Sequence, residues 1–505
     1  MKRFTNILLT LGLIVPMLVF STITRAQNQI DDLKKEQDTL KENVGTLRDK
    51  IGGVEERVAN AEADLSKLTK IKISGYVQAQ WQHFEASNAY PNNYFTIRRA
   101  RFKLQYEPTQ GVVFVLQPDF QPGNFVIKEA YARLNPSWSK TFSLWVGKFN
   151  RPNYEVEYSS SDLEALERSR VITTLYPGEY AIGAKLEVAP PSVPLKFQLA
   201  VFNGNDGLTI PDASGVNLNP DNKDFDNFKD LMARLTYNFK LGKWGGLTIG
   251  AHGYYGFLKA TTDTILKSDY KVDKSIKVGN ALNRNWFGVE AQFYADFLGG
   301  LIIKGEYIMG VNAFPGYNST TTATAQTQAF NKTNDTLTIT TTTTKTTNIR
   351  PNINRNFSGY YVYLIKNIGK KNQFTFRYDY YDPNTKLAGN EIGVSGYSAS
   401  PASKTTTQSV GAGTTLINKV VNKTVVNNSY TSGLTDVAYG QISLCWSYYF
   451  DANIKISLDY DIPFNEKAAS GKVLSNYSVN NVPGSYDYSN MIKQNVLTLR
   501  FQAKF

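Results

Sequence analysis

The sequence predicts an all-β membrane barrel of about 16 antiparallel strands, preceded by a periplasmic α-helical coiled coil. Two observations favour this fold: apolar and polar residues alternate in many short segments, and the connections between these segments are short and long in turn. In a bacterial outer-membrane barrel, lipid contacts one face of each strand and an aqueous lumen contacts the other, and this arrangement produces both patterns.

The last strand gives the clearest alternation. Its apolar residues share one face: Leu497, Leu499, Phe501, Ala503 and Phe505. Its other face is polar and basic: Thr498, Arg500, Gln502 and Lys504. A strand of this kind that ends in phenylalanine is typical of the closing strand of an outer-membrane barrel. We therefore expect Arg500 and Lys504 to line the lumen, and the C-terminal strand to bind the barrel-assembly machinery.

The whole barrel, residues 71–505, repeats this pattern. The predicted strands are 73–85, 94–107, 110–120, 125–136, 142–150, 178–189, 194–204, 229–241, 246–258, 283–295, 300–312, 355–368, 371–382, 436–450, 452–464 and 491–505. Tight turns at one end alternate with longer connections at the other, as expected when both barrel ends lie in the periplasm. The long outer loops are 205–228, 259–282, 313–354, 383–435 and 465–490.

Residues 1–26 have the features of a secretory signal peptide. Lys2 and Arg3 precede an apolar run from Ile7 to Ile23, and small residues at positions 24 and 26 suit a cleavage site after Ala26. A transmembrane anchor is the alternative, and Pro16 in the middle of the run disfavours it. We expect the mature chain in the bacterial outer membrane, with its N-terminal coil in the periplasm.

Residues 27–70 form the predicted coiled-coil segment. The heptad a positions are Ile30, Gln37, Val44, Ile51, Val58 and Leu65, and the d positions are Leu33, Leu40, Leu47, Val54, Ala61 and Leu68. Oppositely charged g and e residues, such as Glu36 and Lys41, favour parallel self-association. A single amphipathic helix on the barrel rim is the alternative.

Two outer loops are rich in threonine, asparagine and serine, at 317–348 and 398–432. They resemble mucin-like or adhesive tracts. We expect instead solvated surface loops, because such segments bury too little apolar area to pack on their own.

The barrel is basic, with 44 basic and 33 acidic residues between positions 71 and 505. Because its lipid-facing band is apolar, this charge belongs to the lumen, loops or rim, and a basic lumen favours anions. The sharpest basic cluster is FTIRRARFKLQY at 95–106. If its apolar residues face lipid, Arg99, Arg101 and Lys103 line the pore in one row, and Arg98 breaks the alternation by snorkelling to the rim or by marking a bulge.

Three segments together resemble the phosphate-selective porin O/P family: FTIRRARFKL, GKFNRPNY and SSSDLEALERS at 159–169. The resemblance implies a trimer of 16-stranded barrels with basic ladders and a constriction formed by the inward-folded loop 151–177. It places Arg99 and Arg101 on the basic strand, and Ser159, Ser160 and Arg168 on the constriction loop. Selective members carry a lysine where this chain has Ser161, which favours a general anion preference over phosphate specificity.

The expected function is that of an outer-membrane porin that passes small anions, with phosphate as a candidate, by passive diffusion. We expect outer-membrane lipids, a homotrimer and a periplasmic partner of the coil as contacts, and neither a cofactor nor nucleic acid. An enzyme is not expected, because neither histidine, His83 or His252, lies in a triad-like pattern.

Three alternatives stay open: a sugar-selective porin, a general porin, and a barrel anchor whose coil tethers the envelope. A sugar porin needs aromatic side chains along its lumen. Most aromatics are expected on the lipid-facing side of their strands instead, such as Phe102, Tyr106, Phe501 and Phe505.

Overall fold

The chain forms two compact units in the computed structural model, residues 1–71 and residues 72–505. The structure describes residues 2–85, 91–121, 123–153, 155–204, 210–211, 217–218, 224, 226–331, 333, 336–411, 416–469, 474–475, 486–491 and 494–505.

The first unit is a single long helix, α1 (Lys2–Thr69), which confirms the helix predicted before the barrel. Its apolar stripe is open to solvent: Ile30, Leu33, Leu40, Val44, Leu47, Ile51, Val54 and Val58 are 47–63% exposed. Within the described helices, no stretch is both long and apolar enough to cross a membrane. The coiled coil and the signal peptide stay predictions, because each concerns a state other than the single full-length chain.

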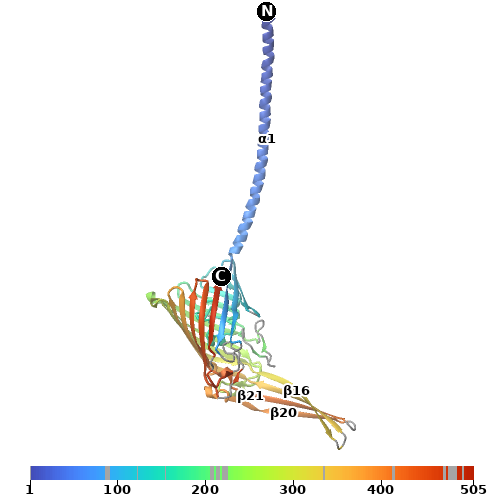
Figure 1. The fold of residues 1–505 in the computed structure, drawn as a ribbon, viewed down its shortest axis with the longest axis vertical. Coiled ribbons are helices and arrows are strands. Elements are labelled where there is room, and N and C mark those ends of the chain that lie inside the picture. Colours follow the sequence, from blue (N-terminus) through green and yellow to red (C-terminus); the bar gives the residue numbers. More distant parts are fainter. Residues whose placement is uncertain are drawn as a thin grey trace. The chain divides into compact units, whose positions relative to one another are not determined.

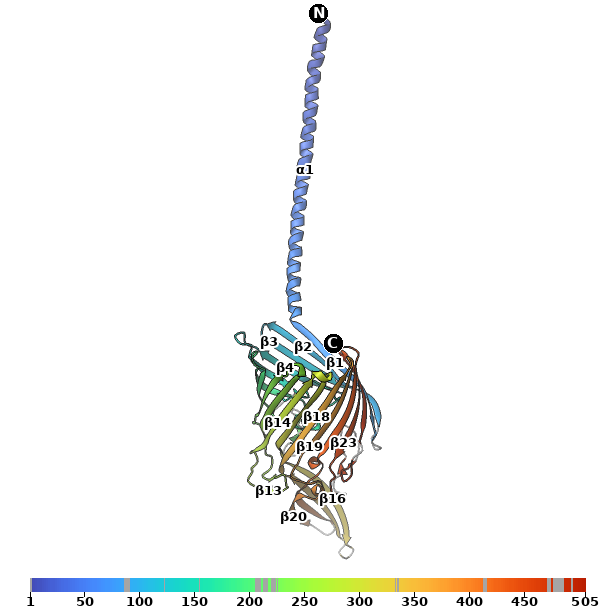
Figure 2. The same cartoon turned by 90° about the vertical axis from the view of Figure 1, so that its left-hand side faces the viewer.

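The second unit is a closed antiparallel barrel of sixteen strands, as predicted (Figures 1 and 2). Its strands are β1 (Ile71–Phe84), β2 (Asn93–Thr109), β3 (Val112–Gln121), β4 (Asn124–Leu134), β5 (Phe142–Asn150), β6 (Tyr180–Val188), β7 (Leu195–Phe202), β10 (Asp230–Lys240), β11 (Gly246–Lys259), β14 (Ala281–Ala295), β15 (Leu301–Phe314), β18 (Asn352–Ile368), β19 (Asn372–Asp382), β22 (Tyr439–Tyr449), β23 (Ile454–Asn465) and β26 (Val496–Lys504). The barrel closes where β1 pairs with β26 in antiparallel register from Tyr76–Lys504 to Phe84–Val496.

The two faces of the wall differ as the alternation predicts. Outward side chains such as Phe114, Leu116 and Phe501 are apolar and exposed. Inward side chains such as Gln78 and Arg500 are polar and buried. Lipid can cover the first set, while the second set finds hydrogen-bond partners inside the barrel.

Short turns join the strands at one end of the barrel, and the long loops lie at the other. The long loops carry short elements: α2 (Arg170–Leu175), β8 (Ile210–Pro211), β9 (Asn217–Leu218), β12 (Ile265–Leu266), β13 (Val272–Asp273), β24 (Leu474–Ser475), β25 (Tyr486–Asp487), η3 (Gly389–Glu391) and η4 (Leu434–Asp436). Two short turns contain η1 (Gly242–Trp244) and η2 (Asp296–Leu298).

The two threonine-rich loops, expected as solvated surface loops, contain regular strands. They form two hairpins, β16 (Tyr317–Asn331) with β17 (Thr336–Arg350), and β20 (Gly396–Gly411) with β21 (Leu416–Thr431). The hairpins join through parallel β17 and β21 into one sheet of order β16-β17-β21-β20, called the outer sheet below (Figure 1). Threonine is β-branched and suits a strand, so backbone hydrogen bonds form this sheet without a large apolar core.

The closure of the barrel predicts a role for its last residue. The backbone N–H of Gly75 donates to the carbonyl of Phe505 at 3.0 Å, and the N–H of Phe505 donates to the carbonyl of Gly75 at 3.0 Å. A side chain at Gly75 would meet the Phe505 ring. Deleting Phe505 removes this final pair, so we expect loss of the heat-modifiable barrel on gels while synthesis and export continue.

The matched control is Phe450→Asp, which changes another exposed aromatic, in the turn between β22 and β23. This variant should still assemble. Normal assembly of the Phe505 deletion would contradict the role of the last residue.

Candidate functional site: the loop inside the lumen

The connection between β5 and β6 leaves the wall and lies inside the barrel. Its hydrogen bonds reach strands around the lumen. Gln78 of β1 and Gln502 of β26 donate to the carbonyls of Ser160 and Ser161 at 3.0 and 2.9 Å. On other strands, Lys455 of β23 donates to Leu163 O at 3.1 Å and Lys304 of β15 donates to Val156 O at 2.8 Å. We call residues 151–179 the lumen loop.

An apolar core fixes one side of the lumen loop. Helix α2 buries Val171, Ile172 and Leu175, and Tyr176 follows it into the same cluster. The Trp286 indole N–H donates to the Tyr176 hydroxyl at 2.7 Å. Aromatic packing of this kind positions side chains through ring contacts as well as buried area.

This core adds to the aromatics that are expected to face lipid. A second set lies within the lumen and packs against the loop: Phe149, Phe202, Tyr254, Trp286, Phe357, Tyr361, Tyr363 and Tyr381. The alternation of a strand shows which residues share a face, but the sequence does not show that an inserted loop will bury the polar face of the wall.

Gly359 of β18 lets α2 approach the wall. A Cβ atom at this position would lie 2.8 Å from Cγ2 and 2.9 Å from Cβ of Val171. These distances are shorter than van der Waals contact, so only glycine fits without a shift of the helix.

Arg168 holds the lumen loop together, and its place on the anion path stays a prediction. Its Nε donates to the carbonyl of Glu157 at 2.8 Å, and its Nη1 pairs with Glu179 at 2.5 Å. Its Nη2 donates to the carbonyl of Tyr158. Only 7% of Arg168 is exposed, so its donors serve the loop's own backbone.

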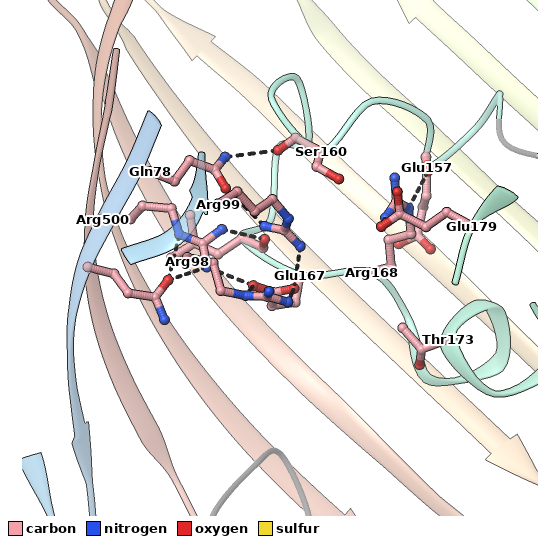
Figure 3. Close-up of polar contacts among 12 residues, drawn as sticks. Gln78, Arg98, Arg99, Glu157, Ser160, Glu167, Arg168, Thr173, Glu179 and Arg500 are labelled. Carbon is pink, nitrogen blue, oxygen red and sulfur yellow. Dashed lines mark hydrogen bonds and ion pairs between the residues drawn. The ribbon is translucent and has the colours of Figure 1, made fainter. Parts of the chain in front are cut away.

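A single carboxylate joins the lumen loop to the wall through three arginines (Figure 3). Glu167 Oε1 accepts from Arg98 Nε at 2.8 Å and from Arg500 Nη2 at 2.7 Å. Glu167 Oε2 accepts from Arg98 Nη2 at 2.9 Å and from Arg99 Nη2 at 3.0 Å. We call these four residues the Glu167 clamp. Charge-assisted bonds that include a bidentate guanidinium are among the strong hydrogen bonds of proteins.

Arg98 shows where the alternation of β2 breaks. Arg98 and Arg99 are adjacent, yet both bind Glu167 inside the lumen. Arg98 therefore does not snorkel to the rim. Two successive inward side chains break the alternation here, and the bulge expected as the other outcome stays a prediction.

Charge pairing also governs the rest of the predicted basic row. Arg101 Nε pairs with Asp119 at 3.0 Å, and Lys103 pairs with Glu129 at 2.6 Å. Both cations turn into the lumen, but each is matched by a carboxylate of a neighbouring wall strand. The row is thus a set of ion pairs and not a ladder of unpaired cations.

The other predicted residues of the path lie where the lumen loop contacts β1 and β26. Ser159 Oγ lies 2.9 Å from Ser161 Oγ, which donates to Asp162 at 3.0 Å, and Asp162 in turn pairs with Lys504. The Ser160 side chain, with Arg500 and Lys455, lines a cavity of about 10 Å³.

Two further acidic residues of the lumen loop pair with cations of the wall. Glu155 pairs with Arg234 at 2.9 Å and with Lys196 at 2.8 Å. Glu164 pairs with Lys304 at 2.8 Å. The negative charge of this loop is therefore largely neutralised where it meets the barrel.

Two carboxylates of the loop, Glu167 and Glu179, have lowered pKa values. Burial acts to raise the pKa of Glu167, but Arg98, Arg99 and Arg500 outweigh it and hold that pKa well below its ordinary value. Burial also opposes ionisation of Glu179, yet Arg168 and Arg101 lower its pKa to about 2. A lowered carboxyl pKa means that these pairs stabilise the fold above the ordinary pKa of glutamic acid and are lost only as the pH falls toward the lowered value.

A cavity of about 1010 Å³ opens at the long-loop end of the barrel, with the lumen loop on its floor; we call it the vestibule. Five arginines and two carboxylates line it: Arg98, Arg168, Arg170, Arg355, Arg500, Glu167 and Asp461. Arg170 donates to Gln441 Oε1 at 3.2 Å and lies 5.7 Å from the Tyr439 ring centre. Among the residues that the structure describes, no carboxylate lies within ion-pair distance of Arg170, in contrast to the other four arginines.

Sequence reasoning missed Arg170 and Glu167. Arg170 lies two residues after Arg168, outside the quoted family motif. Whether it can attract an anion depends on how far the fold places it from carboxylates. Glu167 lies within the segment SSSDLEALERS, where nothing in the sequence distinguishes it from the other glutamates. The sequence does place Arg98 and Arg99 side by side and predicts that Arg500 faces inward. Such a cluster of cations indicates that a carboxylate lies between them.

Comparisons with known proteins agree with this architecture. A sequence model of the phosphate-selective porin O and P family matches residues 71–285, which confirms the resemblance over β1 to the start of β14. No curated protein matches the chain. The family match and the closed barrel together indicate a porin of the bacterial outer membrane.

Three solved structures are similar over most of the chain. The anion-selective porin from Comamonas acidovorans is 10% identical, with a TM-score of 0.44 and coverage of 86% of this chain and 99% of that chain. The trimer form of OmpT from Vibrio cholerae is 9% identical, with a TM-score of 0.43 and coverage of 86% and 99%. OmpF of Salmonella typhi, in complex with daunomycin, is 12% identical, with a TM-score of 0.43 and coverage of 86% and 97%.

The contact at Gly359 predicts that the lumen loop can be displaced without touching its charges. Gly359→Ala forces a methyl group against Val171 and should destabilise the loop by about 1–3 kcal/mol. Limited proteolysis of the folded protein should then cut within residues 151–179 faster than in the unmodified chain.

Gly253→Ala in β11 is the control, because no atom lies within 4 Å of a Cβ placed there. Equal cleavage of the two variants would show that Gly359 does not set the position of α2.

Proposed function

We propose that this outer-membrane porin passes small anions by passive diffusion through the vestibule and past the lumen loop. The observation that carries the proposal is the lining of the vestibule, where Arg98 and Arg500 share the single carboxylate of Glu167 and Arg170 has no carboxylate within ion-pair distance among the described residues. The cavity lies inside a low-dielectric wall, which strengthens the attraction between its cations and an entering anion.

Arg170 is the residue proposed to meet the anion first. Its guanidinium donates to an amide oxygen and lies beside an aromatic ring, and among the described residues no carboxylate lies within ion-pair distance of it. Thr173 and Thr174 line the same cavity and can offer hydroxyl donors beside it. Such a site attracts an anion and also releases it, because it lacks the many donors of a tight binding pocket.

We propose a general anion preference, with phosphate as one permeant solute and not as a selected one. Ser161 stands where selective relatives carry a lysine, and its hydroxyl donates to Asp162 at 3.0 Å. This position therefore supplies no cation to a phosphate. The Arg99, Arg101 and Lys103 row is proposed to set the field of the path through its ion pairs.

A sugar-selective porin remains the second candidate, because aromatic side chains also line the vestibule. They are Tyr94, Phe314, Tyr381, Tyr439, Phe464 and Tyr488. Aromatic rings can pack against the apolar faces of sugars. The two functions differ in what they predict for charge: neutral sugars should permeate equally well whether Arg170 is charged or not.

Reversal potentials in planar bilayers test the anion path. Under a potassium chloride gradient the unmodified channel should prefer chloride, and the preference should weaken near 1 M salt, where the screening length falls to about 3 Å. Arg170→Gln should lower the chloride preference because it removes the vestibule arginine that has no ion-pair partner among the described residues.

Lys419→Gln removes one positive charge from the outer sheet and should leave the reversal potential unchanged. Cation preference in the unmodified channel would contradict the anion proposal. An unchanged reversal potential in Arg170→Gln would remove Arg170 from the path.

We also propose that α1 assembles in parallel with copies of itself in the periplasm, which supports a homotrimer of barrels and offers a surface to an envelope partner. The exposed a and d stripe supports this proposal, because eight apolar side chains at heptad spacing are 47–63% exposed in the single chain.

The coil proposal predicts a difference between two positions of one heptad. Val44→Asp places a charge in the a/d interface and should lower the temperature at which the purified oligomer dissociates on native gels. Thr46→Asp makes a similar change on the outer side of the helix and should have little effect. An oligomer equally stable in both variants would show that the barrels alone supply the contact.

A further inference from the structure

The two edges of the outer sheet are built differently. The β20 edge carries three features that block pairing with another strand: Pro401, which lacks a backbone N–H, a register shift against β21 between Ala399 and Ala402, and the exposed Lys404. Natural sheets use such features to prevent association through open edges.

The β16 edge has none of these features among its described residues. Its fifteen residues, YNSTTTATAQTQAFN, contain no charge, no proline and no glycine. The strand pairs with β17 in unbroken register from Tyr317–Arg350 to Asn331–Thr336. Residues 320–331 are all exposed. At about 3.3 Å per residue, the edge presents roughly 50 Å of backbone with free N–H and C=O groups.

Charge limits where two copies of this sheet can meet. The other three strands carry Lys345, Arg350, Lys404, Lys419 and Lys423, and the described residues of all four strands contain no aspartate or glutamate. Two copies stacked face to face would bring like charges together, which costs free energy. The uncharged β16 edge avoids this repulsion.

We propose that β16 is a docking edge that pairs with β16 of a second copy of this chain. The pairing continues the sheet across two molecules through backbone hydrogen bonds, the mode of β-strand addition. Cross-strand neighbours are then threonine, alanine and glutamine, which pair without charge repulsion. Because the outer sheet belongs to the long-loop end, the contact joins porins at the cell surface.

Cysteine cross-linking of the full chain in outer-membrane vesicles tests this proposal. Thr324 is the middle residue of β16, so Thr324→Cys meets itself whether the two strands run parallel or antiparallel. Thr406→Cys is the matched control, an exposed threonine on the β20 edge. The single native cysteine, Cys445, is buried and adds no background.

We expect Thr324→Cys to give at least about fivefold more disulfide-linked dimer on non-reducing gels than Thr406→Cys, because only the β16 edge is open to pairing. Adding Gln326→Lys to Thr324→Cys should reduce the dimer, whereas adding Thr405→Lys should leave it unchanged. Equal cross-linking at the two edges, no dimer at either, or a disulfide from Thr324→Cys to a different polypeptide would overturn the proposal.

Discussion

The pairing of Glu167 with Arg98, Arg99 and Arg500 is the interaction on which the lumen depends. Three arginines on β2 and β26, the two strands that flank β1, would repel one another inside a narrow barrel, and one carboxylate from the lumen loop binds all three. The clamp therefore does two things: it allows the wall to hold clustered cations, and it holds the loop across the lumen. Truncating one partner of such a group leaves buried charge unpaired, which is costly.

The charge of this pore depends more on which side chains form ion pairs than on the numbers of basic and acidic residues. The barrel has an excess of basic residues, yet the loop carboxylates and the wall carboxylates neutralise many of the inward cations. An entering ion is therefore attracted mainly by the inward cations that are not fully neutralised by a carboxylate. In the described lining of the vestibule, these cations are Arg170 and two arginines of the Glu167 clamp, in which three arginines share one carboxylate.

The strands could be predicted from the sequence because their signal is local. Every strand carries its own alternation, and the wall needs no information from distant residues. The outer sheet shows the opposite case: β17 pairs with β21, about eighty residues later, and uniform threonine tracts carry no alternation that would reveal the pairing. The helical segment before the barrel was likewise readable from its heptads.

The site was predictable only in part. The resemblance brought Ser159, Ser160 and Arg168 to the lumen loop, but the role of each depends on partners far away in the chain. Arg168 donates to the loop's own carbonyls and pairs with Glu179, while Arg170, two residues later, has no carboxylate within ion-pair distance among the described residues. No pattern of residue types distinguishes these arginines; the fold distinguishes them by which acceptors it places nearby.

The central claim is that the Glu167 clamp sets the charge at the floor of the vestibule. The most direct measurement is the reversal potential of Glu167→Gln channels beside the double variant Glu167→Gln/Arg98→Gln. The first removes one negative charge and should raise the preference for chloride over potassium. The second restores the net charge of the clamp and should bring the preference back toward that of the unmodified channel. An identical reversal potential in all three channels would contradict this account.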